Sequence, residues 1–185
     1  DPADYLIAAM LPSYTERSNS SLVYMMDSLI RRSSDPSSGF YRDDPEALNA
    51  AIDRARAGNR KTLLMGVSFA LLDMAEKYSP DLNGVIVMET GGMKGRRKEI
   101  TRGELHSVLK RAFNVNVIHS EYGMTELLSQ SYSQGEGIFH SPPWMKIFIR
   151  DPQDPLTIIT EHRTTGGINI IDLANIHSCS FIATG

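Results

Sequence analysis

The feature that most constrains the fold is an alternation of short apolar runs with helical segments. Apolar runs at 6–11, 62–67, 84–88 and 115–118 read as strands. Between them, apolar residues recur three or four positions apart, as on one face of a helix, at about 20–30, 44–58, 68–77 and 101–112. Alternating strands and helices are typical of a parallel sheet covered by helices. The sequence therefore predicts an α/β fold with a largely parallel sheet and helices on both faces.

Local signals mark the ends of two of these helices. Asp44 offers an N-cap, Pro45 suits the first helical position and Gly58 marks the end. Thr101 and Glu104 form a capping box for a later helix. The residues expected on the buried faces are Leu48, Ile52 and Ala55 in the first, and Leu105, Val108, Leu109 and Ala112 in the second. The segment 33–39, rich in Ser, Asp, Pro and Gly, is expected to be a surface loop.

The pattern changes after about Tyr132. Short β-like runs at 145–149, 156–160, 168–171 and 180–183 are separated by turn residues, with no helix expected among them. We expect an α/β subdomain at 1–135 and a small antiparallel β-rich appendage at 136–185.

Composition narrows the functional class. A hydrophobic content of 41% over 185 residues allows a real core, and a net charge of −3 argues against a general nucleic-acid binder but not against a nucleotide ligand. Cys179 is a single cysteine, so no internal disulfide can form. No apolar run approaches the roughly 18 residues of a membrane span, and the start is not signal-like. The expectation is a soluble cytoplasmic protein.

The segment IHSEYGMTE at 118–126 joins an apolar run to a segment that reads as a helix from Leu127. It offers a ring to stack on a base, a glycine for close backbone approach, a hydroxyl for a phosphate and a carboxylate for a metal ion. A structural interpretation is equally open. Thr125 could cap the helix, Glu126 could lie in its first turn, Gly123 could serve the turn and Tyr122 could be packing.

Three ordered segments extend the pattern. EYGMTE resembles the adenine- and phosphate-binding motif of the adenylate-forming enzymes. Together, LPSYTERSNSSLVYMMDSLI at 11–30, ETGGMKGRRKEITRGELHSVL at 89–109 and IHSEYGMTELLSQSYS at 118–133 resemble the LuxE-type acyl-protein synthetases. These belong to the adenylate-forming enzymes, with the acyl-CoA synthetases and firefly luciferase. The resemblance implies ATP- and Mg²⁺-dependent activation of a fatty acid, then acyl transfer to a cysteine of a reductase-like partner protein. Coenzyme A is the alternative acceptor, and a non-catalytic scaffold that retains the fold is the alternative from another class.

The resemblance also assigns roles to residues. Glu121, Tyr122, Gly123 and Met124 would line the nucleotide, with Tyr122 against the adenine, while Thr125 would reach the α-phosphate and Glu126 would bind Mg²⁺. Further assignments are a turn at the adenine (Thr90, Gly91, Gly92) and contacts to the acyl substrate (Tyr14, Asn19, Ser20, His119). Without the resemblance, two glycines suit any tight turn, Tyr14 to Ser20 read as a loop and helix cap, and His119 as a satisfied histidine at a strand end.

The chain also departs from the family pattern. No Ser/Thr/Gly-rich phosphate loop precedes the run at 6–11, and the lid domain with its catalytic lysine is not in the sequence. The segment 181–185 resembles the family segment that continues into a ribose-binding aspartate. We therefore expect a central portion of a longer enzyme and predict that these 185 residues alone form no acyl-adenylate. Measurable ATP–pyrophosphate exchange with fatty acids would contradict this.

The remaining candidates have structural interpretations. Lys94, Arg96, Arg97 and Lys98 read as a solvated basic loop, although they could meet phosphates. The histidines at 140, 162 and 177 lack metal-ligand spacing. Cys179, in an expected strand, reads as a small buried hydrophobe.

Overall fold

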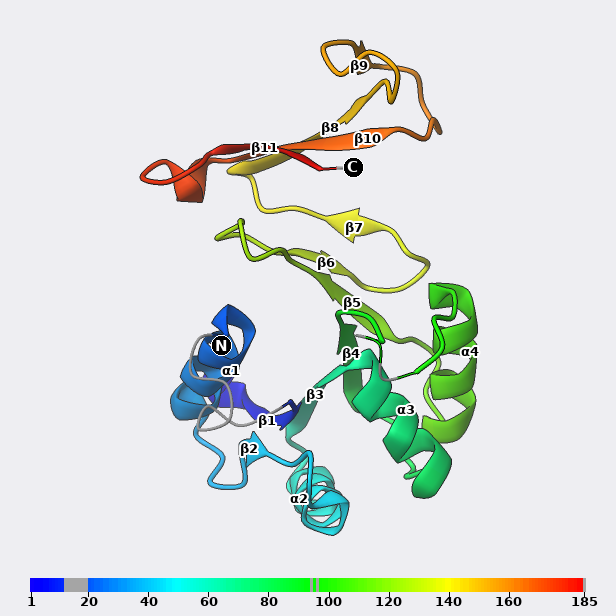
Figure 1. Cartoon of the computed structure of the whole chain (residues 1–185). Helices are drawn as coiled ribbons and strands as arrows, with labels where there is room; N and C mark the ends of the chain where they lie inside the picture. Colours follow the sequence, from blue (N-terminus) through cyan, green and yellow to red (C-terminus); the bar gives the residue numbers. More distant parts are fainter. Residues whose placement is uncertain (12–19, 94, 96, 185) are drawn as a thin grey trace. The chain divides into compact units, whose positions relative to one another are not determined.

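The computed structural model describes residues 1–11, 20–93, 95 and 97–184 (Figure 1). The chain divides into two compact units. The first consists of Asp1–Glu121 and Ser133–Ile138, and the second of Tyr122–Tyr132 and Phe139–Gly185. None of the described helices is long and apolar enough to cross a membrane.

A parallel sheet organises the first unit. Its strands are β1 (Tyr5–Met10), β2 (Gly39–Phe40), β3 (Lys61–Val67), β4 (Ile86–Thr90) and β5 (His119–Tyr122). Neighbours pair in parallel in the order β2-β1-β3-β4-β5. Two short strands, β6 (Ser131–Ser133) and β7 (Phe139–His140), follow β5 in the chain. The predicted α/β fold with a largely parallel sheet is confirmed.

In the described part of the chain, four helices connect the parallel strands, after a 3-10 turn, η1 (Pro2–Asp4). They are α1 (Ser21–Arg32), α2 (Pro45–Ala57), α3 (Ser68–Lys77) and α4 (Arg102–Phe113). The chain steps from β1 to β2 in one direction and from β2 through β3 and β4 to β5 in the other. Right-handed crossovers therefore place α1 on the opposite face of the sheet from α2, α3 and α4. Figure 1 shows α1 and α2 on opposite sides of β1.

The helix ends follow the local signals in the sequence. Asp44 accepts a hydrogen bond from the Ala47 amide at 2.9 Å, Pro45 opens α2 and Gly58 follows its end. The capping box of Thr101 and Glu104 forms with both hydrogen bonds. The expected buried residues of α2 and α4 are at most 4% exposed at Leu48, Ile52, Ala55, Leu105 and Leu109, and Ala112 is partly buried. Val108 is the exception: its side chain is 40% exposed.

Two predicted strands lie later in the chain than expected. β4 begins at Ile86 rather than Gly84, and β5 begins at His119, just after the expected strand at 115–118 ends. The left-handed Asn114 ends α4, and the residues after it lead the chain back to the sheet. Pairing begins only where His119 meets Met88. Polar residues rather than an apolar run therefore form β5.

The helix expected from Leu127 is absent, which is a correction with a clear cause. Residues 123–130 contain turns only, and β6 follows. The amides of Leu128 and Ser129 donate to the Asp172 carboxylate at 3.1 and 2.9 Å instead of to helical carbonyls. Thr125 therefore does not cap a helix, and Glu126 does not lie in a helical first turn.

An antiparallel sheet organises the second unit. It consists of β8 (Met145–Arg150), β9 (Ile158–Ile159), β10 (Gly167–Asp172) and β11 (Phe181–Thr184), in the order β11-β10-β8-β9. All three strand pairs are antiparallel, as predicted. A 3-10 turn, η2 (Leu173–Asn175), follows β10, where no helical segment was expected. Its apolar core is small and centres on Leu127, Met145 and Ile170.

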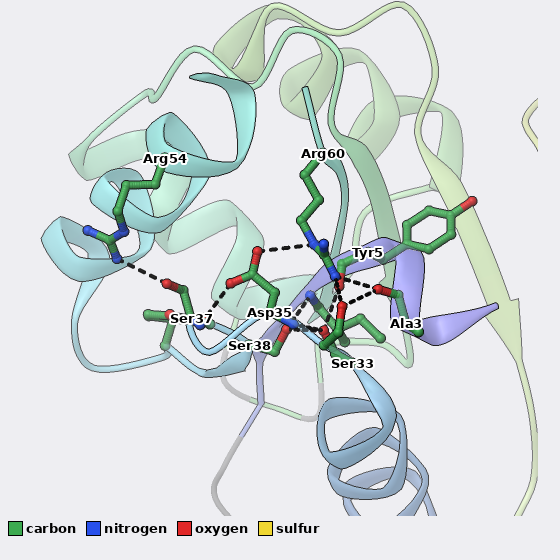
Figure 2. Close-up of polar contacts among 11 residues, drawn as sticks. Ala3, Tyr5, Ser33, Asp35, Ser37, Ser38, Arg54 and Arg60 are labelled. Atoms are coloured by element: carbon green, nitrogen blue, oxygen red, sulfur yellow. Dashed lines mark hydrogen bonds and ion pairs between the residues drawn. The ribbon is translucent and has the colours of Figure 1, made fainter. Parts of the chain in front are cut away.

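The loop at 33–39 is fixed by its own side chains (Figure 2). The Ser33 hydroxyl donates to the Tyr5 carbonyl at 2.6 Å, and the Ser38 hydroxyl donates to Ser33 Oγ at 2.8 Å. Asp35 forms an ion pair with Arg60 at 3.2 Å. These polar groups anchor the loop to the start of β1, which gives this Ser-rich segment a structural role.

Close packing at Gly66 in β3 provides a test of the first unit. A Cβ atom at this position would lie 2.7 Å from Leu71 Cδ2 and 2.9 Å from Met10 Cβ. We expect Gly66→Ala to lower the free energy of unfolding by about 1 to 3 kcal/mol, because an added carbon overpacks the core. The matched control is Gly103→Ala in α4, where a Cβ meets nothing within 4 Å. That variant should be neutral or stabilised by up to about 1 kcal/mol, and urea denaturation would measure both. Equal stabilities for the two variants would contradict the packing seen at β3.

Candidate functional site

Buried polar residues gather where β4 and β5 end, in the first unit. Glu89 and Thr90 close β4 and are 3% and 4% exposed, while Ser120 and Glu121 in β5 are 0% and 9% exposed. Strand pairing places Glu89 opposite Ser120 and Thr90 opposite Glu121. Because the carboxyl ends of parallel strands form the usual ligand crevice of open α/β sheets, this cluster marks a candidate site.

A network of hydrogen bonds surrounds Glu89. Ser68 Oγ at the start of α3 donates to its Oε2 at 3.1 Å, and His106 Nε2 lies 3.5 Å from its Oε1. Ser120 Oγ lies 3.3 Å from the same His106 nitrogen, and Arg102 Nε approaches Glu89 Oε1 to 3.5 Å. Burial by itself would raise the pKa of Glu89, but the hydrogen bonds from His106, Ser120 and Ser68, with the charge of Arg102, outweigh it and lower the pKa. Glu89 is therefore held as a buried anion.

Glu121, the first residue of EYGMTE, has a pKa that is shifted in the opposite direction. The Thr90 hydroxyl donates to Glu121 Oε2. Burial raises the pKa of Glu121, and the nearby Glu89 charge adds to this, although the Thr90 hydrogen bond works against them. Two neighbouring carboxylates in one cluster thus differ in how readily they ionise, a contrast that marks many functional sites.

Glu121→Gln tests this difference by its pH dependence. A carboxyl whose pKa is raised on folding stabilises the protein while protonated and loses that contribution as the pH rises through the folded-state pKa. Glutamine mimics the protonated acid and can still accept from Thr90. The variant should therefore unfold at a higher temperature than the wild type at pH 7, and this advantage should vanish at pH 4. Thermal denaturation followed by circular dichroism measures it, and an advantage that grows on acidification would contradict the account.

The turn after β4 holds the glycines expected at the adenine. Gly91 has a φ of +69°, in the region that favours glycine, and Gly92 is exposed. Ser68 Oγ donates to the Gly91 carbonyl at 2.9 Å, so the turn is tied to the start of α3. Of these three residues, Thr90 contacts Glu121, through its hydroxyl and through strand pairing.

The basic loop beyond this turn is partly neutralised. Arg97 forms ion pairs with Asp73 and Glu76 of α3, and the hydrogen bonds that it donates to Glu76 lead the effects that raise its pKa. Lys98 is exposed, and Lys94 and Arg96 lie outside the described residues. Arg97 therefore ties the loop to α3.

The residues expected at the acyl substrate have mixed outcomes. Ser20 caps α1, because its hydroxyl accepts from the Val23 amide at 3.4 Å. Tyr14 and Asn19 lie outside the described residues. His119 is half-buried in β5, where burial lowers the pKa of its imidazole and favours the neutral form at pH 7. Of the two described residues in this group, Ser20 lies at the start of α1 and His119 lies in β5, next to the buried polar cluster.

The rest of EYGMTE belongs to the second unit. The Tyr122 hydroxyl donates to Met124 Sδ at 3.2 Å, and its ring meets Phe139 edge-on with centroids 6.2 Å apart. Both Tyr122 and Met124 are partly buried against the small core of this unit. Gly123, Thr125 and Glu126 are exposed. Thr125 and Glu126 thus present a hydroxyl and a carboxylate to solvent.

Two further expectations concern a Mg²⁺ ligand at Glu126 and a buried cysteine at Cys179. The described residues contain no group of three or more His, Cys, Asp or Glu that could hold a metal ion. A single carboxylate such as Glu126 still suits Mg²⁺, which proteins often bind through one or two carboxylates and substrate phosphates. The prediction that Cys179 is a buried strand residue is wrong: its side chain is exposed, because β11 begins only at Phe181.

Several residues in these two regions were not predicted from the sequence. They are Ser68, Glu89, His106 and Ser120 around the β4 and β5 ends, and Asp172 and Asn175 in the second unit. The available signal was local: Glu89 and Ser120 directly precede residues that the family resemblance assigned. Their partners are separated by 14 to 21 positions in the chain, which no short motif reveals.

Comparisons with known proteins give the fold a context. No protein-family model matches the chain, and no curated protein matches it by sequence. Over its whole length it is similar to the unliganded O-succinylbenzoate coenzyme A synthetase (MenE) of Bacillus subtilis, with 16% identity and a TM-score of 0.59. The same synthetase in complex with AMP gives 15% identity over the whole chain and a TM-score of 0.57. CmiS6 gives 15% identity over 92% of the chain and a TM-score of 0.55.

The chain has the fold of part of these proteins. It spans 40%, 38% and 41% of the lengths of the unliganded synthetase, its AMP complex and CmiS6. At 15 to 16% identity, the similarity to these proteins shows a shared fold and assigns no residue roles.

Proposed function

We propose that this chain is part of an adenylate-forming enzyme that activates a carboxylic acid with ATP. The observation that carries the proposal is the fold shared with O-succinylbenzoate coenzyme A synthetase, which has been solved with AMP. The resemblance of EYGMTE to the nucleotide motif of the adenylate-forming enzymes supports it independently. In this chain that motif begins in β5 and continues beyond its carboxyl end, where open α/β sheets bind ligands.

The chemistry follows from the groups that the motif offers. A carboxylate oxygen of the substrate attacks the α-phosphorus of ATP, the new P–O bond forms the acyl-adenylate, and pyrophosphate leaves. Glu126 would hold Mg²⁺, which neutralises phosphate charge, and Thr125 would donate its hydroxyl to an α-phosphate oxygen. Tyr122, Gly123 and Met124 would line the nucleotide.

The residues at the β4 and β5 ends have supporting roles in the proposal. Thr90, Gly91 and Gly92 would contact the adenine through the backbone, with Glu121 beside them. His119, with its pKa lowered, is neutral at pH 7 and would donate a hydrogen bond to the substrate carboxylate. A fatty acid is the substrate that the LuxE-type resemblance favours.

Two thiols are candidates for the acceptor of the acyl group. The LuxE-type resemblance favours a cysteine of a partner protein, whereas the similarity to a coenzyme A synthetase favours coenzyme A. In either case a thiol sulfur attacks the acyl carbon and AMP leaves. Acyl release from preformed adenylate by the enzyme that contains this chain, with and without coenzyme A, separates the two.

Calorimetric titration of the chain with AMP tests the nucleotide site. We expect saturable binding, and stronger binding of a non-hydrolysable acyl-adenylate analogue, which occupies the acyl contacts as well. Absence of binding to both ligands, even by the longer protein that contains this chain, would favour the scaffold alternative, since a scaffold has no need of Thr125 or Glu126.

A further inference from the structure

A buried carboxylate holds the backbone that follows the nucleotide motif. Asp172, at the end of β10, is 0% exposed. Its Oδ2 accepts the amides of Leu128 at 3.1 Å and Ser129 at 2.9 Å, and its Oδ1 accepts the Ser129 hydroxyl at 2.8 Å and the Ala174 amide at 3.1 Å. Four donors thus converge on one side chain, which compensates for the burial of its charge.

The electrostatics of Asp172 agree with this geometry. Burial by itself would raise the pKa of Asp172, but the hydrogen bonds from Ser129, Ala174 and Leu128 outweigh it and lower the pKa. The carboxylate is therefore ionised at neutral pH, when all four donors find an acceptor.

A second side chain, in η2 directly after β10, bonds to the backbone of the motif itself. Asn175, in η2, is 5% exposed, and its Nδ2 donates to the Glu126 carbonyl at 2.7 Å and to the Cys179 carbonyl at 2.9 Å. Trp144 Nε1 donates to Ser129 Oγ at 2.9 Å and reinforces the anchor. The backbone from Glu126 to Ser129 is thus held at three groups: the Glu126 carbonyl, the Leu128 amide and the Ser129 amide.

These anchors act on a segment without regular secondary structure. In residues 123–130 few backbone groups bond to one another, so their position depends on side chains from elsewhere in the second unit. Asp172 and Asn175 bind the backbone and leave the side chains of Thr125 and Glu126 exposed. A misplacement of about 1 Å in such a group can cost a hundredfold in activity.

We propose that Asp172 and Asn175 are positioning residues that hold Thr125 and Glu126 for the nucleotide. The proposal rests on the proposed function, because it needs EYGMTE to bind AMP or ATP. It adds that the end of β10 and η2, which lie outside EYGMTE, set the affinity of the site.

The test compares two substitutions with a matched control. Asp172→Asn keeps the shape but removes the charge and one acceptor, and Asn175→Ala removes the donor to Glu126. Asp154→Asn is the control, because Asp154 makes similar bonds, to the Leu156 amide and the Thr157 hydroxyl, in the β8–β9 hairpin. By calorimetry, each substitution at Asp172 or Asn175 should raise the Kd for AMP about tenfold or more, and the control should leave it unchanged.

The readout separates positioning from stability. Unfolding raises an apparent Kd only by the reciprocal of the folded fraction, so circular dichroism at the assay temperature shows how much of any change it explains. If Asp172→Asn does not fold, Asn175→Ala decides. Folded variants that bind AMP as tightly as the wild type would overturn the proposal.

Hydrogen exchange keeps the two proposals distinguishable. In Asp172→Asn the amides of Leu128 and Ser129 should exchange about tenfold faster or more, with no such change in Asp154→Asn. If the wild type binds no AMP but this exchange result holds, the proposed function fails while the anchoring stands. If the wild type binds AMP and exchange at these amides is unaltered in Asp172→Asn, the positioning role is overturned.

Discussion

Replacing Glu89 by Ala should lower the free energy of unfolding by about 3 to 5 kcal/mol, as expected when one partner is removed from a buried charged network. The side chain is 3% exposed and lies among Ser68, His106 and Arg102. Without the carboxylate, the buried polar groups of Ser68 and His106 each lose one of their partners, and a cavity remains beside them. Urea denaturation of the wild type and the variant measures the loss.

An exposed glutamate provides the control for Glu89→Ala, and the stability loss of Glu89→Ala should depend on pH. Glu99→Ala changes an exposed side chain and should alter stability by less than about 0.5 kcal/mol. Because the pKa of Glu89 is lowered on folding, its contribution is present above its ordinary pKa and is lost as the pH falls through the folded-state value. The deficit of Glu89→Ala should therefore shrink in acid. A deficit no larger than that of Glu99→Ala at pH 7 would show that the network does not support β4.

The second large effect concerns the two exposed side chains of the motif. Thr125→Val should weaken binding of both AMP and MgATP about 10- to 100-fold, since it removes a hydrogen bond to a charged phosphate. Glu126→Gln should weaken MgATP by a similar factor but leave AMP binding unchanged, because AMP binding does not require the metal ion.

Each of these variants is the control for the other. The measurement is a calorimetric titration with AMP and with ATP, the latter in the presence and absence of Mg²⁺. If Glu126→Gln weakens AMP as much as MgATP, the assignment of Glu126 to the metal is wrong. If Thr125→Val leaves both affinities unchanged, the hydroxyl does not contact the phosphate.

Features set by neighbouring residues could be predicted from the sequence. The N-cap at Asp44 and the capping box at Thr101 depend on residues three positions apart and form as expected. The bounds of α3 were also predicted, because β3 ends and the helix begins within one contiguous apolar segment. Hydrophobic periodicity was therefore sufficient for α1 to α4 and for the class of the sheet.

Features that depend on residues far apart in the chain could not be predicted from the sequence. The register of β5 depends on its pairing with Met88, about thirty positions earlier, so the strand was expected four residues too early. The helix expected after Glu126 is replaced by bonds to Asp172, more than forty positions away. The candidate site divides in the same way: EYGMTE is contiguous and was found, whereas Glu89 and its partners become neighbours only in the folded sheet.

Titration of the ¹⁵N-labelled chain with AMP, followed by nuclear magnetic resonance, shows whether EYGMTE binds the nucleotide. We expect saturable shifts of the amide signals of Gly123, Met124, Thr125 and Glu126, and their loss in Thr125→Val. Saturable shifts confined to other parts of the chain, or none at any AMP concentration, would contradict the claim that this segment binds the nucleotide.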